Sequence, residues 1–184
     1  MSEHHILFSG EVTPQSASNF TATLIQLAGH AASKVVIALN SGGGNVVSGI
    51  AMYNAMLAMP YEIITHNIGN CDSIANVIFL GGTKRYACAA STFMFHGVGF
   101  NGTANIRYEE NNLREMLDTI LADHARISGI LNTRTNGGIS VKAGMKLFKE
   151  QKTRTAQWAL DKGLITGIGD FAFPVGGNVH LLIN

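Results

Sequence analysis

Charged residues are scarce in this sequence. Asp, Glu, Lys and Arg together make up 14% of the 184 residues, the net charge is +1, and Lys and Arg are scattered rather than clustered. Without a basic patch, the sequence gives no indication of a nucleic-acid partner. Hydrophobic residues make up 46% of the chain, and so few charges cannot cover the surface of a monomer generously. We therefore expect a homo-oligomer with a buried subunit interface.

Cysteines are rare in the sequence, and long apolar runs are missing. Cys71 and Cys88 are the two cysteines; they cannot form a disulfide framework, their spacing fits no zinc site, and we interpret them as small hydrophobic residues. No apolar run is long enough to cross a bilayer, so we expect no membrane partner. The first residues, MSEHHILF, lack a basic leader and a cleavable apolar segment. These features predict one soluble, cytoplasmic domain.

Strand and helix patterns alternate along the first half of the chain. Thr13 and Pro14 are typical of a helix start, and Phe20, Leu24 and Leu27 share the face that this helix would bury. Alternation of this kind predicts an α/β fold with a mostly parallel sheet. The expected strands are residues 5–8, 34–39, 62–67, 85–88 and 92–96, and the expected helices are residues 15–31, 46–57 and 74–80.

The second half of the chain is dominated by a long helical pattern over residues 105–133. At ~1.5 Å per residue it would span roughly 40 Å. It could project and pack on a neighbouring subunit, or it could lie along its own core. Ser140 and Thr155 are expected to begin two short helices. The tail after Ile165 could form an edge strand or an interface.

A polar turn followed by an apolar run, NCDSIANVIFLGG, spans residues 70–82. Ser73 lies between a predicted strand and a predicted helix, where free backbone N–H groups favour developing negative charge. This order of elements can hold a nucleophilic serine. In the alternative interpretation, Asp72 or Ser73 simply caps the helix.

Three consecutive glycines, residues 42–44, lie between a buried strand and a helix. The loop lacks the Gly-Lys-Ser/Thr ending of a P-loop, and Val47 stands where a dinucleotide fingerprint needs its third glycine. We therefore expect no nucleotide and no other cofactor. Glycines here could let a backbone N–H approach a reacting carbonyl as half of an oxyanion hole. The alternative is a tight turn without a ligand.

Several segments together resemble the Clp protease proteolytic subunit family, within the wider crotonase-like fold. Residues 40–54, NSGGGNVVSGIAMYN, are similar to the family's NSPGG segment and its following helix. Residues 79–87, FLGGTKRYA, and 93–96, FMFH, resemble its LAAG-x-KRxA and VMIH segments. Residues 155–165, TAQWALDKGLI, resemble its late T-A-x-E-A-x-x-x-G-L-I helix. The similarity extends from the first strand to about residue 165.

The resemblance implies a crotonase-like ββα superhelix with a mostly parallel sheet and a long projecting helix, in one domain over residues 1–184. It also implies a serine peptidase in which Ser73 is the nucleophile and His96 the general base. The backbone N–H groups of Gly44 and Ile74 fall on the oxyanion hole. The implied partners are peptides or unfolded proteins, further copies in stacked rings, and an ATP-driven unfoldase.

The chain departs from the family pattern in three places. Gln151 stands at the position of the family's catalytic aspartate, with Glu150 beside it. A Gln carbonyl can hold the tautomer of His96 but cannot stabilise the imidazolium by charge, so we expect a slower enzyme unless Glu150 takes the role. Gly42 replaces the usual proline and loosens the loop. Few residues precede the first strand, which weakens the expectation of an unfoldase partner.

We therefore predict a serine endopeptidase, a hydrolase that acts through a Ser73 acyl-enzyme inside an oligomeric ring. One alternative is a weak or inactive structural or regulatory subunit, which would not react with a fluorophosphonate. Another is a crotonase-like acyl-thioester enzyme, which would be retained by coenzyme A on a column. No metal is expected. The other histidines show no ligand spacing and are interpreted as exposed or hydrogen-bonded structural residues: His4, His5, His30, His66, His124 and His180.

Overall fold

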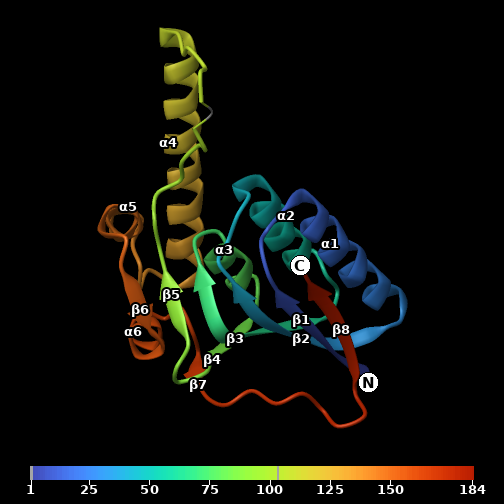
Figure 1. The fold of residues 1–184 in the computed structure, drawn as a ribbon. Helices are drawn as coiled ribbons and strands as arrows, with labels where there is room; N and C mark the ends of the chain where they lie inside the picture. The colour runs from blue at the N-terminus through green and yellow to red at the C-terminus, as the bar shows by residue number, and fades with distance from the viewer. Residues whose placement is uncertain (1, 103) are drawn as a thin grey trace.

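A mostly parallel, twisted sheet forms the centre of the computed structural model, which describes residues 2–102 and 104–184 (Figure 1). The strand order is β6-β5-β3-β2-β1-β8, with β4 paired to β3 and β7. Every pairing is parallel except that of β5 with β6. The strands are β1 (Ser2–Ser9), β2 (Ala32–Ser41), β3 (Glu62–Asp72), β4 (Lys84–Ala87), β5 (Thr92–Met94), β6 (Thr153–Thr155), β7 (Gly167–Ile168) and β8 (Asn178–Ile183).

In the described part of the chain, six helical segments connect and flank these strands. They are α1 (Pro14–Gly29), α2 (Val46–Leu57), α3 (Ala75–Phe79), α4 (Glu110–Arg134), α5 (Val141–Glu150) and α6 (Ala156–Asp161). Thr13 caps α1, as predicted, and forms a reciprocal capping box with Ser16. Ser140 and Thr155 cap α5 and α6, as also predicted.

The core lies between the sheet and the helices α1, α2 and α3, which lie side by side (Figure 1). The predicted face of α1 is confirmed, because Phe20, Leu24 and Leu27 are fully buried. Phe20 packs edge-on against Phe8 of β1, with the ring centroids 5.9 Å apart. The alternation of residues on β1 and β2 puts their apolar side chains on this same face. This packing holds the strands in place, and with them the loops that follow the strands.

The long helix α4 projects well beyond the body of the molecule (Figure 1). It begins at Glu110, later than the predicted residue 105, after the left-handed Asn105 and at a capping box formed by Glu109 and Asn112. Its base packs near α3 and α5, whereas its upper half carries the exposed side chains of Leu113, Leu117 and Leu121. None of the described helices combines the length and apolar composition that crossing a bilayer requires.

Arg85, in strand β4, joins the chain at or just after the ends of the helices α3, α4 and α6. Its buried guanidinium donates hydrogen bonds to the carbonyls of Gly82, Arg134, Gly163 and Leu164 over 2.7–3.2 Å. These carbonyls lie after α3, at the end of α4 and after α6, where helices leave acceptors unsatisfied. One side chain therefore holds the base of α4 against the body.

The tail of the chain runs as an extended segment under the sheet before it forms β8 (Figure 1). Strand β8 pairs in parallel with β1, so that Asn178 to Ile183 lie beside His4 to Ser9. The alternative of an edge strand, left open by the sequence, is thus the observed one.

Candidate active site

Ser73 follows β3 directly and has a left-handed backbone, with φ = 55°. A serine seldom adopts this conformation, and it persists only where neighbouring groups enforce it. Here the Ser73 N–H donates to the Met94 carbonyl at 2.8 Å. The side-chain amide of Asn76 donates to the carbonyls of both Ser73 and Met94, at 3.1 and 2.9 Å. These bonds fix Ser73 at the end of the strand.

Ser73 does not cap α3. The N-cap residue of this helix is Ile74, and no side chain accepts a hydrogen bond there. The capping interpretation of Ser73 and Asp72 is therefore wrong. Ser73 is half-buried and lines a cavity instead.

The glycine loop approaches Ser73 from β2. A Cβ atom added to Gly43 would lie 2.7 Å from the Cβ of Ser73 and 3.2 Å from the nitrogen of Ile74. The loop is held to the start of the chain by bonds from Val12 N–H to the Gly43 carbonyl and from Asn45 N–H to the Val12 carbonyl, both 2.7 Å. Only a residue without a side chain permits this approach at φ = 91°.

Two backbone N–H groups remain free beside Ser73. Within the described residues, neither the N–H of Gly44 nor that of Ile74 has a hydrogen-bond acceptor. Both residues line the same cavity as Ser73. The two predicted oxyanion-hole residues thus lie next to the predicted nucleophile, and unpaired donors of this kind can bind an oxyanion.

His96 lies two residues beyond β5, the strand whose end is hydrogen-bonded to Ser73. Phe93 and Phe95 are buried, and alternation along the chain turns the exposed His96 to the other side. Its Nδ1 lies 2.8 Å from the carbonyl oxygen of Gly97. A carbonyl can only accept, so Nδ1 carries the proton and Nε2 keeps the lone pair that a general base needs.

One cavity of about 700 Å³ brings these groups together. Ser73, Ile74, Gly44 and His96 all line it, next to the middle of α4. No hydrogen bond joins Ser73 to His96 in the described part of the chain. In unliganded enzymes such bonds often form only when the substrate binds. The arrangement can therefore support acyl transfer to a serine hydroxyl.

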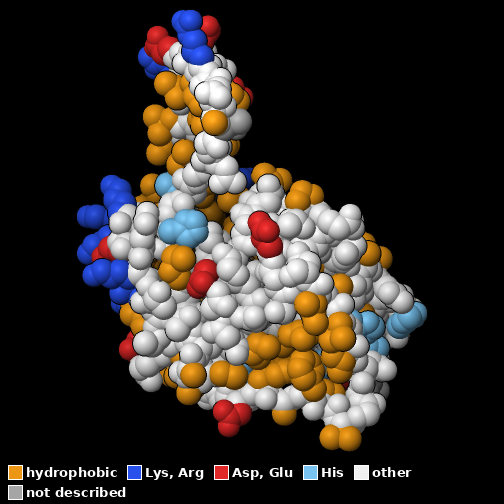
Figure 2. Space-filling view, viewed as in Figure 1, with side chains coloured by type: hydrophobic (Ala, Val, Ile, Leu, Met, Phe, Trp, Pro, Cys, Tyr) orange, Lys and Arg blue, Asp and Glu red, His pale blue; other side chains and the backbone are white. Residues whose placement is uncertain are grey.

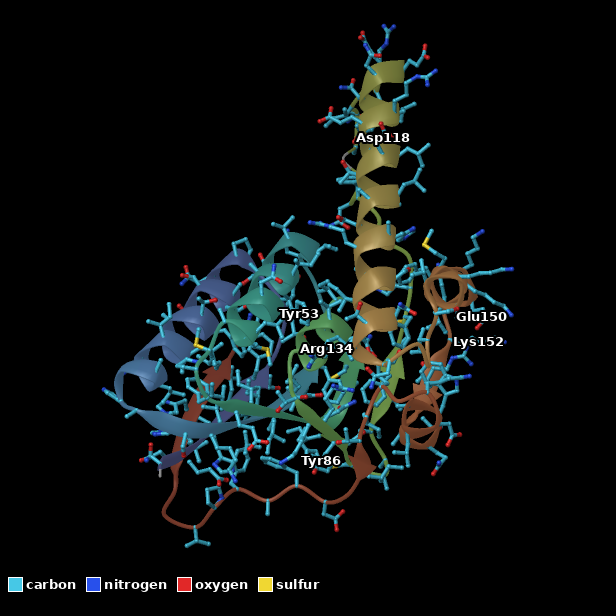
Figure 3. The ribbon with its side chains drawn as sticks, turned by 180° about the vertical axis from the view of Figure 1, so that it is seen from behind. Tyr53, Tyr86, Asp118, Arg134, Glu150 and Lys152 are labelled. Atoms are coloured by element: carbon cyan, nitrogen blue, oxygen red, sulfur yellow. The ribbon has the colours of Figure 1, made fainter. Side chains whose placement is uncertain are left out.

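The two residues considered for the role of the triad's aspartate, Gln151 and Glu150, form no hydrogen bond with His96 in the part of the chain that the structure describes. Gln151 is exposed, ends α5 in a left-handed conformation and does not line the cavity. Glu150 pairs with Arg154 and, at 3.4 Å, with Lys146. Figure 3 shows Glu150 at the side of the molecule formed by α5 and α6. The bond to His96 that the sequence analysis assigned to one of these residues is made by the Gly97 carbonyl.

Sequence reasoning missed a carboxylate in the cavity. Asp123 of α4 is only 6% exposed, lines the cavity and pairs with Arg126. A signal for it existed, because Asp123 interrupts the apolar positions Ile120 and Ile127 at helical spacing. Next to it, His124 accepts a hydrogen bond from Val98 N–H through Nε2 at 2.9 Å. This bond ties α4 to the segment that follows His96.

The two cysteines do not compete with Ser73 for the nucleophile's role. Cys71 is fully buried, and burial raises the pKa of its thiol well above the ordinary value. Cys88 lies 3.6 Å from Nε2 of His66, away from the cavity. Both cysteines are free. The residues that the structure describes contain no group of three or more His, Cys, Asp and Glu side chains placed to bind a metal.

The interpretation of the remaining histidines as exposed or hydrogen-bonded holds for His66, which donates to the Gly169 carbonyl at 3.1 Å, and is wrong for Nδ1 of His5. His4, His5 and His66 are each 6–7% exposed. Nδ1 of His5 is buried and has no partner among the described residues. The reason is that the tail residues Phe171 and Phe173 cover this face of the sheet and pack against His5, at 6.5 Å between ring centroids.

Comparison with known proteins shows the family of the chain. The family model described as Clp protease matches residues 1–171. The ATP-dependent Clp protease proteolytic subunit 1 of Leifsonia xyli subsp. xyli is 29% identical over 177 residues, covering 94% of this chain and 86% of that protein. The ATP-dependent Clp protease proteolytic subunit of Ligilactobacillus salivarius is 30% identical over 172 residues, covering 89% and 81%.

A solved structure shares the fold. A ClpP1 mutant from Listeria monocytogenes superposes with a TM-score of 0.77 at 18% identity, over 91% of this chain and 92% of that chain. The mostly parallel sheet with a long projecting helix, expected from the sequence, is thereby confirmed, and the shared fold is consistent with the crotonase-like arrangement. With the family model covering nearly the whole chain, the protein belongs to the Clp protease family.

Proposed function

We propose that this protein is a serine endopeptidase that cleaves peptides or unfolded proteins through an acyl-enzyme on Ser73. One observation carries the proposal: a left-handed Ser73 shares a cavity with His96 and with the free N–H groups of Gly44 and Ile74. The names of the relatives support the same activity, because they are proteolytic subunits of a Clp protease.

In the first half of the reaction, the Ser73 oxygen attacks the carbonyl carbon of the scissile bond. Its proton passes to Nε2 of His96, and the carbonyl oxygen becomes an oxyanion held by the N–H groups of Gly44 and Ile74. The imidazolium then gives its proton to the leaving amine as the C–N bond breaks. In the second half, a water molecule attacks the acyl carbon while His96 takes one of its protons. The bond from the acyl carbon to the Ser73 oxygen then breaks, His96 returns the proton to that oxygen, and the carboxylic acid leaves.

The Gly97 carbonyl supplies part of what an aspartate supplies in a triad. Its bond to Nδ1 holds the required tautomer and orientation of His96. It carries no full negative charge, so it stabilises the imidazolium less than a carboxylate would. The proposal therefore includes a reduced turnover, as the sequence analysis expected for a chain with Gln151. The chemistry calls for no cofactor.

We further propose that the protein works as a ring-shaped homo-oligomer. The exposed leucines at positions 113, 117 and 121 form an apolar stripe on the projecting part of α4, which a second copy would cover. An ATP-driven unfoldase is a candidate partner, because the relatives are ATP-dependent. The cytoplasmic location stays a prediction from the sequence.

The test is hydrolysis of an unstructured protein substrate, such as fluorescently labelled casein, by the purified chain. Ser73→Ala should lower kcat/KM by at least ~10³-fold, and His96→Gln by roughly 10²–10⁴-fold. Gel filtration and circular dichroism of both variants should match the parent protein. Hydrolysis that survives Ser73→Ala would overturn the proposal.

A further inference from the structure

Asn76 lies in the first turn of α3, three residues after Ser73, and is 1% exposed. Its side-chain Nδ2 donates to the Ser73 carbonyl at 3.1 Å and to the Met94 carbonyl at 2.9 Å. Met94 is the last residue of β5, two positions before His96. One amide group therefore joins the segment of the nucleophile to the segment of the general base.

The pairing of β3 with β5 ends one residue before Ser73. The last pair in the register is Asp72 with Met94, and the left-handed backbone of Ser73 then turns the chain away. Beyond that pair, the bond from Ser73 N–H to the Met94 carbonyl and the Asn76 amide hold the two segments together. The Asn76 side chain thus extends the connection past the end of the sheet, toward the place where Ser73 and His96 must meet.

The stability of the fold does not account for this amide. The Ser73 carbonyl also accepts from the backbone N–H of Asn76 at 3.2 Å, and the Met94 carbonyl also accepts from that of Ser73 at 2.8 Å. Both carbonyls would therefore keep a donor without the side chain. Oδ1 of Asn76 is buried with no hydrogen-bond partner among the described residues, which is energetically costly in a helix whose other residues are apolar.

The binding of substrate does not account for the amide either, because Asn76 does not line the cavity. Its effect on His96 passes through the chain. Phe95, between Met94 and His96, is 2% exposed and packs against Trp158, with 6.1 Å between the ring centroids. A residue held in this way leaves little freedom between the Met94 carbonyl and the imidazole.

We propose that Asn76 is a positioning residue, whose amide sets the distance and orientation of His96 relative to Ser73. This inference rests on the proposed peptidase function. Within the described residues, no hydrogen bond joins the Ser73 hydroxyl to His96, so proton transfer depends on how far the two segments must move to meet. Holding a carbonyl of each segment on one amide limits that movement.

The first experiment is steady-state hydrolysis of an uncharged fluorogenic peptide ending in Ala-Ala-norleucine by the assembled protein. On the face shown in Figure 2, Lys and Arg gather near α5 and at the tip of α4, and a peptide without charge keeps them out of the comparison. Asn76→Ala should lower kcat by roughly 10- to 100-fold and change KM by less than about twofold, because it displaces the general base and leaves the cavity walls intact. An unchanged kcat would overturn the inference and leave the peptidase function standing.

Urea denaturation distinguishes positioning from a loss of stability. The midpoint of Asn76→Ala should stay within about 0.5 M of the parent value, since no carbonyl loses its last donor. Thr65→Val is the matched control, because the buried Thr65 hydroxyl donates to the Phe79 carbonyl at the other end of α3, at 2.8 Å. It should lower the midpoint at least as much and keep the parent kcat. An equal fall of kcat in both variants would contradict the inference.

Asn76→Ser separates the two bonds of the amide. A serine hydroxyl in a helix donates to a carbonyl three or four residues earlier, here that of Ser73, and its single proton cannot also serve Met94. This variant should therefore be about as slow as Asn76→Ala, and it tests the inference even if Asn76→Ala does not fold. A parent-like kcat would mean that only the turn at Ser73 matters, which would refute the link to His96.

Hydrogen exchange separates the inference from the proposed reaction. The Ser73 amide proton, which is bonded to the Met94 carbonyl, should exchange roughly tenfold faster in Asn76→Ala and Asn76→Ser than in the parent protein, and less so in Thr65→Val. If exchange responds in this way but the parent protein cleaves no peptide, the peptidase proposal fails while the Asn76 bridge stands. If exchange does not respond, the bridge is refuted.

Discussion

Ser73 and Gly44 line the same cavity in backbone conformations that few residues can adopt. Gly44 has φ = 142°, and a Cβ atom added there would lie 2.3 Å from the carbonyl oxygen of Val12. The loop can therefore present its N–H to a substrate only because residue 44 has no side chain. Both residues could be proposed from the sequence, Ser73 from the polar turn at residues 70–82 and Gly44 from the glycine loop at residues 42–44.

Gly44→Ala should lower kcat/KM by ~10²–10³-fold, the usual effect of losing one oxyanion-hole donor. The methyl group must push the loop away from Val12 and misplace the N–H. Gly29→Ala is the matched control, because a Cβ atom there meets nothing within 4 Å, and it should leave activity unchanged. Full activity in Gly44→Ala would show that this N–H does not act on the substrate.

His124 links pH to the position of the segment after His96. Burial lowers its pKa, with Asp123 opposing the effect. The unfolded chain takes up this proton near pH 6.5, whereas the folded chain takes it up only at lower pH. The free energy of unfolding should therefore fall as pH drops below that value, until the folded pKa is passed.

His124→Gln should make this loss of stability less steep. An amide can still accept from Val98 N–H and does not titrate. Urea denaturation at pH 7.5 and pH 5.5 measures the difference, with His30→Gln as the control at an exposed histidine. An equally steep pH dependence in His124→Gln and the parent protein would exclude His124 as its source.

At the scale of elements, Arg85 accounts for how α4 is held. Its four carbonyl acceptors lie beyond or at the ends of different helices, so no local pattern in the sequence identifies them. A buried guanidinium bonded only to carbonyls stays charged at a desolvation cost that its hydrogen bonds must offset.

Arg85→Gln should lower the free energy of unfolding by about 3 kcal/mol or more, because several buried acceptors lose their donor. Lys84→Gln changes the neighbouring residue, whose pair with Glu62 at 2.9 Å is exposed. Lys84→Gln should lower the free energy of unfolding by about 1 kcal/mol or less. Chemical denaturation of both variants gives the comparison, and equal losses would contradict the role of Arg85.

The elements also show where prediction from sequence succeeds. The strands β1 to β5 and the helix α1 were predictable because burial on one or both faces leaves a periodic apolar pattern, whereas the short strands β6 and β7 were not predicted. The hydrogen bond from His96 to the Gly97 carbonyl could not be predicted. Every residue has a backbone carbonyl, and only the path of the chain after β5 brings this one to His96. Asp123 was missed for a related reason, since its importance depends on α4 crossing the cavity.

At the scale of the whole molecule, the projecting half of α4 has too little of its own chain to pack against. Its exposed leucines at positions 113, 117 and 121 are 53%, 54% and 49% exposed. Few charged residues are available to solvate such a surface. Both observations favour assembly with further copies.

Replacing these three leucines with serine should dissociate the oligomer and leave each subunit folded, because the side chains contribute little to their own core. Light scattering coupled to gel filtration would give the mass, and circular dichroism the fold. As a control, Ile25→Ser removes an exposed apolar side chain from α1, at 59% exposure, and should leave the mass unchanged. A parent protein that is already monomeric would contradict the account of assembly.

Covalent labelling by a fluorophosphonate, located by mass spectrometry, tests the central claim most directly, because it reports the reactivity of one hydroxyl without any choice of substrate. The account predicts one adduct per chain on Ser73, strongly slowed in His96→Gln and absent in Ser73→Ala. A chain that stays unlabelled while folded, or that is labelled equally fast without His96, would contradict it.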